Sequence, residues 1–339
     1  MPRGTLCGAV TFQWVRRRKH LGRVTVCVSM SFATLATCTT DDRVPPRIPQ
    51  EQHVVAAVGD IACGNPSDHP ADADDACRDH LVADLVRTID PDRLLLLGDI
   101  QYPSDDDVVS YERHFDRSFG RLRSISSPTP GDAEWDGHTG EYFSYFGEVA
   151  GPPHGYYSFE LGAWHVLSLN SPDCLDADGC GVGTPQFEWL RADLEAHPPD
   201  RYPCTLAFWH DPRFLWVSWW QRDGRPRGPQ PHVRPLWDLL QDWDAEVVLG
   251  GNAHNYERWL PQDAAGLPDA DGLTQFVVGT GGRRLNEAGP EPRPTQLAAF
   301  QDDAFGALRL TLGPGEYSWS WRSAAGEPAF KDEGTAACH

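Results

Sequence analysis

The sequence predicts an α/β fold, and three features of the residue pattern support this class. Short apolar runs at residues 53–58, 93–97 and 245–249 are typical of strands buried on both faces. Segments with helical periodicity separate these runs, and the C-terminal part contains several further strand patterns. Alternating strands and helices followed by a strand-rich end indicate one large domain built on mixed sheets.

Each element follows from a local pattern, taken in chain order. Residues 74–88 carry apolar side chains at helical spacing, and residues 107–119 form a second predicted helix. Residues 155–171 contain two period-2 apolar runs around Gly162, which predict a hairpin. A Thr-Pro pair opens the helix predicted at residues 184–196. The remaining predicted elements are a helix at 233–243 and strands at 201–209, 275–278, 304–312 and 316–322.

The charge of the chain excludes two classes of partner. The chain has 339 residues and a formal net charge of −20. Residues 1–38 hold six Lys/Arg and no Asp/Glu, which leaves 23 basic against 49 acidic residues in the remainder, a charge of −26. A chain this acidic repels nucleic acid and anionic membranes, so we expect neither as a partner. Any site for an anion must therefore be locally basic.

The N-terminus predicts an export signal at residues 1–38, followed by a tether at 39–52 and one domain at 53–339. Basic residues precede an apolar stretch that is too short to span a bilayer comfortably. The Leu-Ala-Thr-Cys sequence that ends at Cys38 resembles a lipoprotein cleavage site. We therefore expect a secreted or cell-envelope protein, with membrane contact only through a lipid anchor at Cys38.

The cysteines agree with export. Six follow the predicted signal and permit 15 pairings: Cys63, Cys77, Cys174, Cys180, Cys204 and Cys338. The spacing favours Cys63–Cys77 and Cys174–Cys180 as local links, which leaves Cys204 for Cys338. A cysteine metal site is the alternative, and the absence of any Cys-x-x-Cys pair disfavours it.

Polar residues with metal-ligand chemistry follow several predicted strands. The five segments are 58–60 (VGD), 97–102 (LGDIQY), 130–134 (PGDAE), 208–212 (FWHDP) and 250–258 (GGNAHNYER). Ligands of open α/β sheets bind where strand ends meet in one crevice. Asp, Tyr and His are ligands for hard and borderline metals, so the segments together predict a metal site. Gly precedes both Asp60 and Asp99, which favours ligation over a helix-cap role for them.

These segments resemble those of the calcineurin-like metallophosphoesterases, and most closely the purple acid phosphatase-like secreted branch. The resemblance runs from about residue 53 to the C-terminus and includes residues 157–165 and 276–282. It implies a four-layer α/β/β/α sandwich of two mixed sheets, which suits the observed alternation of strands and helices. It also implies a phosphoric ester hydrolase with a two-metal site and a small-molecule phosphoester or other anion as its partner.

The resemblance implies a first metal site made of Asp60, Asp99, Tyr102 and His254, all of which are present. Asp99 would bridge to the second site. A packed aromatic is the ordinary role of a lone Tyr, but in a Gly-Asp-x-x-Tyr segment Tyr102 resembles a phenolate ligand. A phenolate selects ferric iron, so iron or a substitute metal is the expected occupant of the first site.

The second site is altered relative to the family. It would consist of Asp99, Asp132, His210 and Asn252, with Asp132 in place of an Asn and Asn252 in place of a His. This oxygen-rich set favours Mn, Mg or Ca over zinc. Ala133 stands where the family has its catalytic His, which leaves Asp132 and His210 as the candidate catalytic residues. Loss of a general acid typically costs a factor of about 10²–10⁴ in rate, so we expect reduced phosphatase activity.

An aromatic and arginine-rich segment follows His210 and would overhang the crevice as a substrate lid. Its members are Trp216, Trp219, Trp220, Arg222 and Arg225. Stacking and bidentate hydrogen bonds from such a set suit an aromatic or sugar-bearing anion. A hydrophobic plug with solvated arginines is the equal alternative.

Three functions remain open at this point. The first is an exported metal-dependent phosphoester hydrolase that tolerates its altered second site. The second is a pseudophosphatase that keeps the fold and one metal and binds a ligand or a partner. The third is a one-metal site recruited to chemistry other than phosphoester cleavage.

Overall fold

Two mixed β-sheets organise the protein. The computed structural model describes residues 50–64, 77–104, 108–175, 179–217, 230–289, 292–324 and 330–339. The first sheet has the order β13-β12-β11-β1-β2-β3, built from β1 (His53–Val58), β2 (Arg93–Leu97), β3 (Ser126–Thr129), β11 (Gly306–Gly313), β12 (Glu316–Ser323) and β13 (Glu333–Ala337). The second has the order β10-β8-β9-β7-β6-β5-β4, built from β4 (Tyr157–Leu161), β5 (Trp164–Ser168), β6 (Cys204–Phe208), β7 (Val247–Gly250), β8 (Tyr256–Gln262), β9 (Leu273–Val278) and β10 (Leu297–Gln301).

The strands that lead to the predicted site segments are parallel to their neighbours. In the first sheet β1 pairs with β2 and β2 with β3 in parallel, and in the second β5, β6, β7 and β9 are parallel in turn. Antiparallel strands flank both parallel groups, with β11 beside β1 and β4 beside β5. The carboxyl ends of parallel strands therefore meet along one edge of each sheet, where the site segments begin.

Successive side chains of the buried strands point to opposite faces of each sheet, and this alternation produces three apolar layers. Val55 and Ala57 of β1 belong to the core between the sheets, whereas Ala56 and Val58 face the helices outside the first sheet. In the second sheet Val247 and Leu249 line the central core and Val248 faces the outer helices. Burial on both faces explains why these strands read as continuous apolar runs. The result is the four-layer α/β/β/α sandwich that the family resemblance implies.

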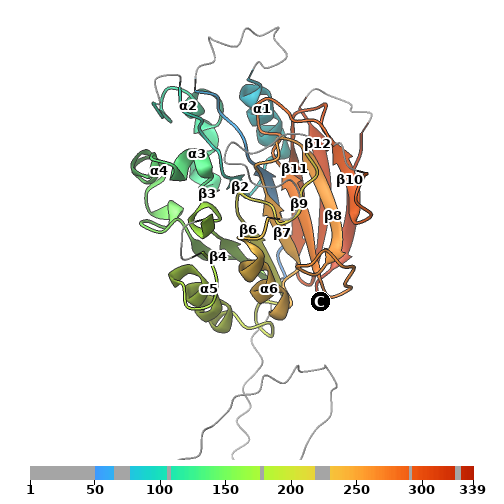
Figure 1. The fold of residues 1–339 in the computed structure, drawn as a ribbon. Coiled ribbons are helices and arrows are strands. Elements are labelled where there is room, and N and C mark those ends of the chain that lie inside the picture. The colour runs from blue at the N-terminus through green and yellow to red at the C-terminus, as the bar shows by residue number, and fades with distance from the viewer. Residues whose placement is uncertain are drawn as a thin grey trace, which may run out of the picture. The chain divides into compact units, whose positions relative to one another are not determined.

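Helices cover the outer faces of both sheets (Figure 1). The first sheet carries α1 (Asp79–Ile89), α2 (Phe115–Ser118) and α4 (Thr139–Phe146), while the second carries α5 (Pro185–Ala196) and α6 (Arg234–Asp242). The one-turn helix α3 (Asp132–Trp135) and the 3₁₀ turns η1 (Gly120–Ile125), η2 (Gly147–Ala150) and η3 (Pro172–Leu175) lie in the connections. Among the described residues, no helix is long and apolar enough to cross a membrane.

In the described part of the chain, three disulfides close the fold with the pairing that the spacing favours. They join Cys63 to Cys77, Cys174 to Cys180 and Cys204 to Cys338. The last bond fastens the C-terminus to the start of β6, and the backbone N–H of His339 donates to the buried carboxylate of Glu246 at 3.2 Å.

The structure corrects one predicted helix. Residues 108–119, the described part of the helix predicted at 107–119, do not form a continuous helix: the helix is confined to α2, and η1 follows it. The backbone N–H of Phe115 donates to the side chain of Gln101 at 3.0 Å, so a tertiary contact satisfies the first helical donor and α2 begins there. The predicted helix at 74–88 is observed as α1, and the hairpin at 155–171 as β4 and β5 around Gly162. The predicted export signal and nearly all of the tether lie outside the described residues and stay predictions.

Candidate metal centre

The predicted ligands arrive at one edge of the two sheets. Asp60 follows β1, Asp99 follows β2, Asp132 opens α3 after β3, His210 follows β6, and Asn252 and His254 follow β7. The connections are tied to one another through the backbone, since the N–H of Asp60 donates to Gly98 and that of Gly251 to His210. Two sheets thus contribute to one group of side chains.

Asp60, Tyr102 and His254 form the first cluster. The Tyr102 hydroxyl lies 3.0 Å from Asp60 Oδ1 and 3.0 Å from His254 Nε2, and His254 Nε2 lies 3.2 Å from Asp60 Oδ1. His254 Nδ1 donates to the carbonyl of Arg284 at 2.8 Å, which directs Nε2 toward the cluster. Metal-binding histidines commonly have this second hydrogen bond, because it fixes the tautomer and the ring orientation.

Asp99, His210 and Asp132 form the second cluster. His210 Nε2 lies 3.4 Å from Asp99 Oδ1 and 3.2 Å from Asp132 Oδ1, and His210 Nδ1 donates to the carbonyl of Leu97 at 2.9 Å. His210 is fully buried, whereas the side chain of Asp132 is 59 % exposed. The two clusters are adjacent, because ligand atoms of Asp60, Asp99 and His210 all lie within 4.8 Å of one another.

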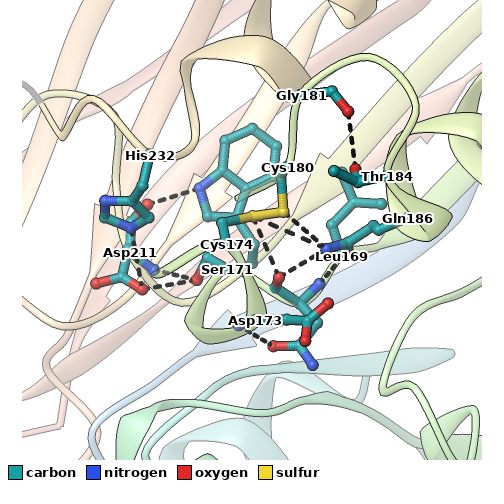
Figure 2. Close-up of a disulfide and its surroundings, with 12 residues drawn as sticks. Leu169, Ser171, Asp173, Cys174, Cys180, Gly181, Thr184, Gln186, Asp211 and His232 are labelled. Carbon is teal, nitrogen blue, oxygen red and sulfur yellow. Dashed lines mark hydrogen bonds and ion pairs between the residues drawn. A yellow bond between two sulfur atoms is a disulfide. The ribbon is translucent and has the colours of Figure 1, made fainter. Parts of the chain in front are cut away.

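Asn252 joins the clusters through both its backbone and its side chain. Its backbone N–H donates to Asp60 Oδ2 at 2.8 Å, and its side-chain Nδ2 donates to Asp211 Oδ1 at 2.8 Å. Asp211 is buried and also accepts a hydrogen bond from Ser171 Oγ at 2.9 Å (Figure 2). The amide nitrogen is therefore engaged away from the metal-ligand atoms.

Backbone strain is concentrated at these positions. Six non-glycine residues in the described part of the chain have positive φ, and four of them are Asp60 (59°), Asp99 (46°), Asn252 (63°) and His254 (50°). Residues other than glycine avoid this region unless the surrounding structure imposes it, and such residues cluster at functional sites. This clustering is independent of the side-chain chemistry and identifies the same place in the fold.

Two glycines allow the close approach of these side chains. A Cβ atom on Gly131 would lie 2.2 Å from Asp99 Oδ1, and one on Gly98 would lie 2.5 Å from His210 Nδ1. Neither position can carry a side chain without displacing a candidate ligand.

Glu134 was given no role from the sequence, yet it supports both aspartate loops. It is fully buried, and its carboxylate accepts the backbone N–H groups of Ile100 (2.9 Å), Gln101 (3.1 Å) and Gly131 (2.8 Å). The side chain thus fixes the segment that follows Asp99 relative to the turn that presents Asp132. Glu134 lies three residues after the glycine that precedes α3, a spacing typical of a capping box. This spacing is the sequence signal from which its role could have been predicted.

Electrostatics show that the donor set fits a cation. Burial, and then the neighbouring charge of Asp132, raise the pKa of Asp99 well above its usual range. Burial also raises the pKa of Tyr102, with the charges of Asp60 and Asp99 adding to the effect. Burial would lower the pKa of His210, but the carboxylates of Asp99 and its neighbours outweigh it and raise that pKa. Burial and mutual repulsion both disfavour the charged forms of these acidic groups, and a bound cation would offset that effect. Their oxygen atoms and the imidazole nitrogens are suitable ligands for a metal ion.

The predicted lid is described at one of its residues. Trp216 packs against Phe300 at 4.9 Å between ring centroids, and its backbone N–H donates to buried Glu257 at 2.9 Å. Trp216 is thus a partly buried aromatic of the outer core. The other lid residues, Trp219, Trp220, Arg222 and Arg225, lie outside the described residues, so the lid stays a prediction.

His165, Asp193 and His197 form a separate group with metal-ligand chemistry. The two imidazole rings stack with centroids 4.0 Å apart and planes 12° apart, and His197 Nδ1 donates to the carbonyl of Asp193 at 2.7 Å. A metal lies close to the plane of each imidazole that binds it, which two stacked parallel rings cannot both satisfy. We interpret this group as a buried link between β5 and α5.

The fold and the strand-end cluster resemble those of metallophosphoesterases, and comparisons with known proteins agree. No family model matches the chain. Purple acid phosphatase 21 of Arabidopsis thaliana is 27 % identical over 284 residues, covering 76 % of this chain and 61 % of that protein. Acid phosphatase type 7 of Danio rerio is 25 % identical over 257 residues, covering 65 % of this chain and 56 % of that protein. The chain thus spans less than two thirds of these relatives.

Solved structures show the same fold. Purple acid phosphatase PPD1 from yellow lupin (Lupinus luteus) superposes with a TM-score of 0.68 at 18 % identity, covering 85 % of this chain and 54 % of that one. GAP50, the anchor in the inner membrane complex of Plasmodium, has a TM-score of 0.55 at 12 % identity and covers 83 % of this chain and 88 % of that one. Together the matches support a calcineurin-like metallophosphoesterase of the purple acid phosphatase type.

Proposed function

We propose that the chain is an exported metal-dependent phosphoester hydrolase whose second metal site is altered and whose phosphatase activity is reduced. The observation that carries this proposal is the convergence of Asp60, Tyr102 and His254 within 3.2 Å of one another, directly beside Asp99 and His210. Three further features support this cluster: the hydrogen bonds that orient both histidines, the strained backbone, and the glycines that allow the side chains to approach closely. A protein that no longer bound metal would not need to keep all of them.

The two clusters suit different metals. In the first, Tyr102 as a phenolate together with two carboxylates and His254 favours iron, since hard anionic oxygens suit a ferric ion. In the second, Asp132 and the oxygen of Asn252 make the set richer in oxygen and favour Mn, Mg or Ca. Bound metals would act as Lewis acids toward phosphoryl oxygens and supply a nucleophile near neutral pH.

The protein's own residues position and stabilise rather than transfer protons rapidly. His210 is held by Leu97 and faces both Asp99 and Asp132, so it orients the second cluster. Ala133, the second residue of α3, offers no general acid, which limits the rate. The Arg283 guanidinium lies 4.7 Å from the centre of the Tyr102 ring and supplies local positive charge in an acidic chain.

We propose a small phosphoester or related anion as the substrate and no nucleic acid as a partner, because the net charge of −20 opposes polyanions. Export is supported by the three disulfides, which form in oxidising compartments. An anchor at Cys38 would be the membrane contact. Of these features, the disulfides alone lie among the described residues.

A phosphomonoesterase assay tests the proposal. Hydrolysis of p-nitrophenyl phosphate is measured after chelation and after addition of iron, Mn, Mg, Ca or Zn. We expect activity to vanish on chelation, to return with metal and to be lost in Asp99→Asn. Asp193→Asn is the matched control, because Asp193 is a largely buried carboxylate hydrogen-bonded to Ser158 at 2.8 Å in the separate His165 group. Activity that survives chelation, or an active Asp99→Asn, would refute the proposal.

A pseudophosphatase is the second candidate, and the pairing of second-site donors with one another favours it. His210 Nε2 lies 3.2 Å from Asp132 Oδ1. The similarly folded GAP50 is the anchor in the inner membrane complex of Plasmodium, so the fold also occurs in a protein named for an anchoring role. Inactivity with every metal, combined with tight binding of one metal ion per chain, would favour this candidate or a one-metal site with other chemistry.

A further inference from the structure

Asn252 can serve a metal only through its amide oxygen, because the amide nitrogen has no free lone pair. The orientation of the amide group therefore decides whether this position is a ligand. In the structure Nδ2 donates to Asp211 Oδ1 at 2.8 Å, and both side chains are buried. An ionised carboxylate only accepts hydrogen bonds, so it holds the amide with nitrogen toward Asp211 and oxygen away from it.

Asp211 is itself fixed by several contacts. Ser171 Oγ donates to Asp211 Oδ2 at 2.9 Å and accepts the backbone N–H of Asp211 at 2.8 Å (Figure 2). His232 Nε2 lies 3.6 Å from Asp211 Oδ2. Both carboxylate oxygens of Asp211 thus accept hydrogen bonds, Oδ1 from Asn252 and Oδ2 from Ser171.

Consecutive residues after β6 face two parts of the second cluster. His210 contacts Asp99 and Asp132 directly, and Asp211 contacts Asn252. One short connection therefore places one ligand and orients another. The sequence shows a single feature of this arrangement, an Asp beside a candidate His ligand.

We infer that Asp211 is a positioning residue for the second metal, which orients the Asn252 oxygen as a ligand in place of an imidazole. This inference rests on the proposed function, since it concerns the same metal centre. Residues that orient metal ligands typically change metal affinity by about 10–100-fold when they are replaced.

The test is calorimetric titration of the metal-free full chain with Mn²⁺, which reports each site separately and needs no activity. Asp211→Asn keeps the shape but presents either an oxygen or an NH₂ group to Asn252, so the orientation is no longer enforced. We expect affinity for the second, weaker Mn²⁺ to fall about 10–100-fold and the first to stay unchanged. Asp193→Asn, the same change at a carboxylate held by Ser158 and His165, should leave both affinities unchanged.

A swapped pair controls for misfolding. Asp211→Asn combined with Asn252→Asp reverses the hydrogen bond and keeps the net charge, so one carboxylate oxygen of position 252 faces the metal again. We expect the pair to recover second-site binding to at least the wild-type level. Wild-type affinity in Asp211→Asn, equal loss at both sites, or no recovery in the pair would overturn the inference. Uptake of a single Mn²⁺ by the wild type would also overturn it, while the chelation assay would still decide the hydrolase proposal.

Discussion

Restoring the altered positions together should convert a slow enzyme into a faster one. The change is Asp132→Asn with Ala133→His and Asn252→His. Ala133 is the second residue of α3 and its backbone N–H donates to Asp99 Oδ1 at 2.9 Å, so an imidazole at this position starts beside the Asp99 carboxylate. An imidazole at position 252 would find Asp211 in place to accept its second N–H, an arrangement typical of metal-binding histidines.

The structure ranks the contributions to the rate. A general acid typically contributes about 10²–10⁴, or at least about 2.7 kcal/mol of barrier at the lower limit. Repulsion between Asp132 and a phosphate charge at about 4 Å ranges from about 1 kcal/mol in water to about 4 kcal/mol at an effective dielectric of 20. The Asp132 side chain is 59 % exposed, so screening favours the lower figure. The missing acid therefore outweighs the extra charge.

The assay is kcat/KM for a phosphomonoester at saturating metal. We expect the triple variant to exceed the parent by about 10² or more, and each single change to do far less, because the three residues share one site and are not additive. A parent as fast as the triple variant would refute the reasoning, since Asp132 and Asn252 would then be fully working ligands.

Three further predictions concern stability. Glu134→Gln places an amide NH₂ group where a carboxylate oxygen now accepts backbone N–H groups, so it should lower the free energy of unfolding by about 1–3 kcal/mol. Urea denaturation measures this, and an unchanged unfolding midpoint would contradict it. Burial raises the pKa of Glu246 to about 8 and of Glu257 to about 7, so the folded chain holds protons that the unfolded chain releases. The free energy of unfolding should therefore fall as pH rises from about 5 to 8, and it should fall less steeply in Glu257→Gln than in the wild type. Chemical denaturation in the presence of a chelator measures both. Cys338→Ser opens a bond spanning 134 positions and should cost about 2–5 kcal/mol; unchanged thermal unfolding would contradict it.

The sequence predicts those parts of the fold that rest on local patterns. The strands β1, β2 and β7 are buried on both faces, so they form continuous apolar runs, and one glycine separates each strand from Asp60, Asp99 or Asn252. Because the carboxyl ends of parallel strands meet at one edge of a sheet, residues that follow these strands lie at that edge. The pairs of cysteines could be favoured for a similar reason, because two of the three bonds close short loops.

Elements set by tertiary contacts could not be predicted in this way. The strand β3 contains Ser126, Ser127, Pro128 and Thr129 without an apolar run, and it exists because it pairs with β2. The predicted helix at 107–119 fails because Gln101 takes the N–H of Phe115.

The support of the site is also non-local. Asp211 and Asn252 are 41 positions apart, and Glu134 bonds to residues 33 and 34 positions away. Their residue types are visible in the sequence, but their partners follow only from the packing of the two sheets.

Metal content and phosphomonoesterase rate measured on the same samples test the central claim most directly. Metal-free chain is titrated with metal while bound equivalents and hydrolysis are recorded together. We predict one tightly held ion with little activity, followed by a rate that rises as a second, weaker ion binds. Full activity without metal, or two tightly held zinc or iron ions in the protein as purified, would contradict the account.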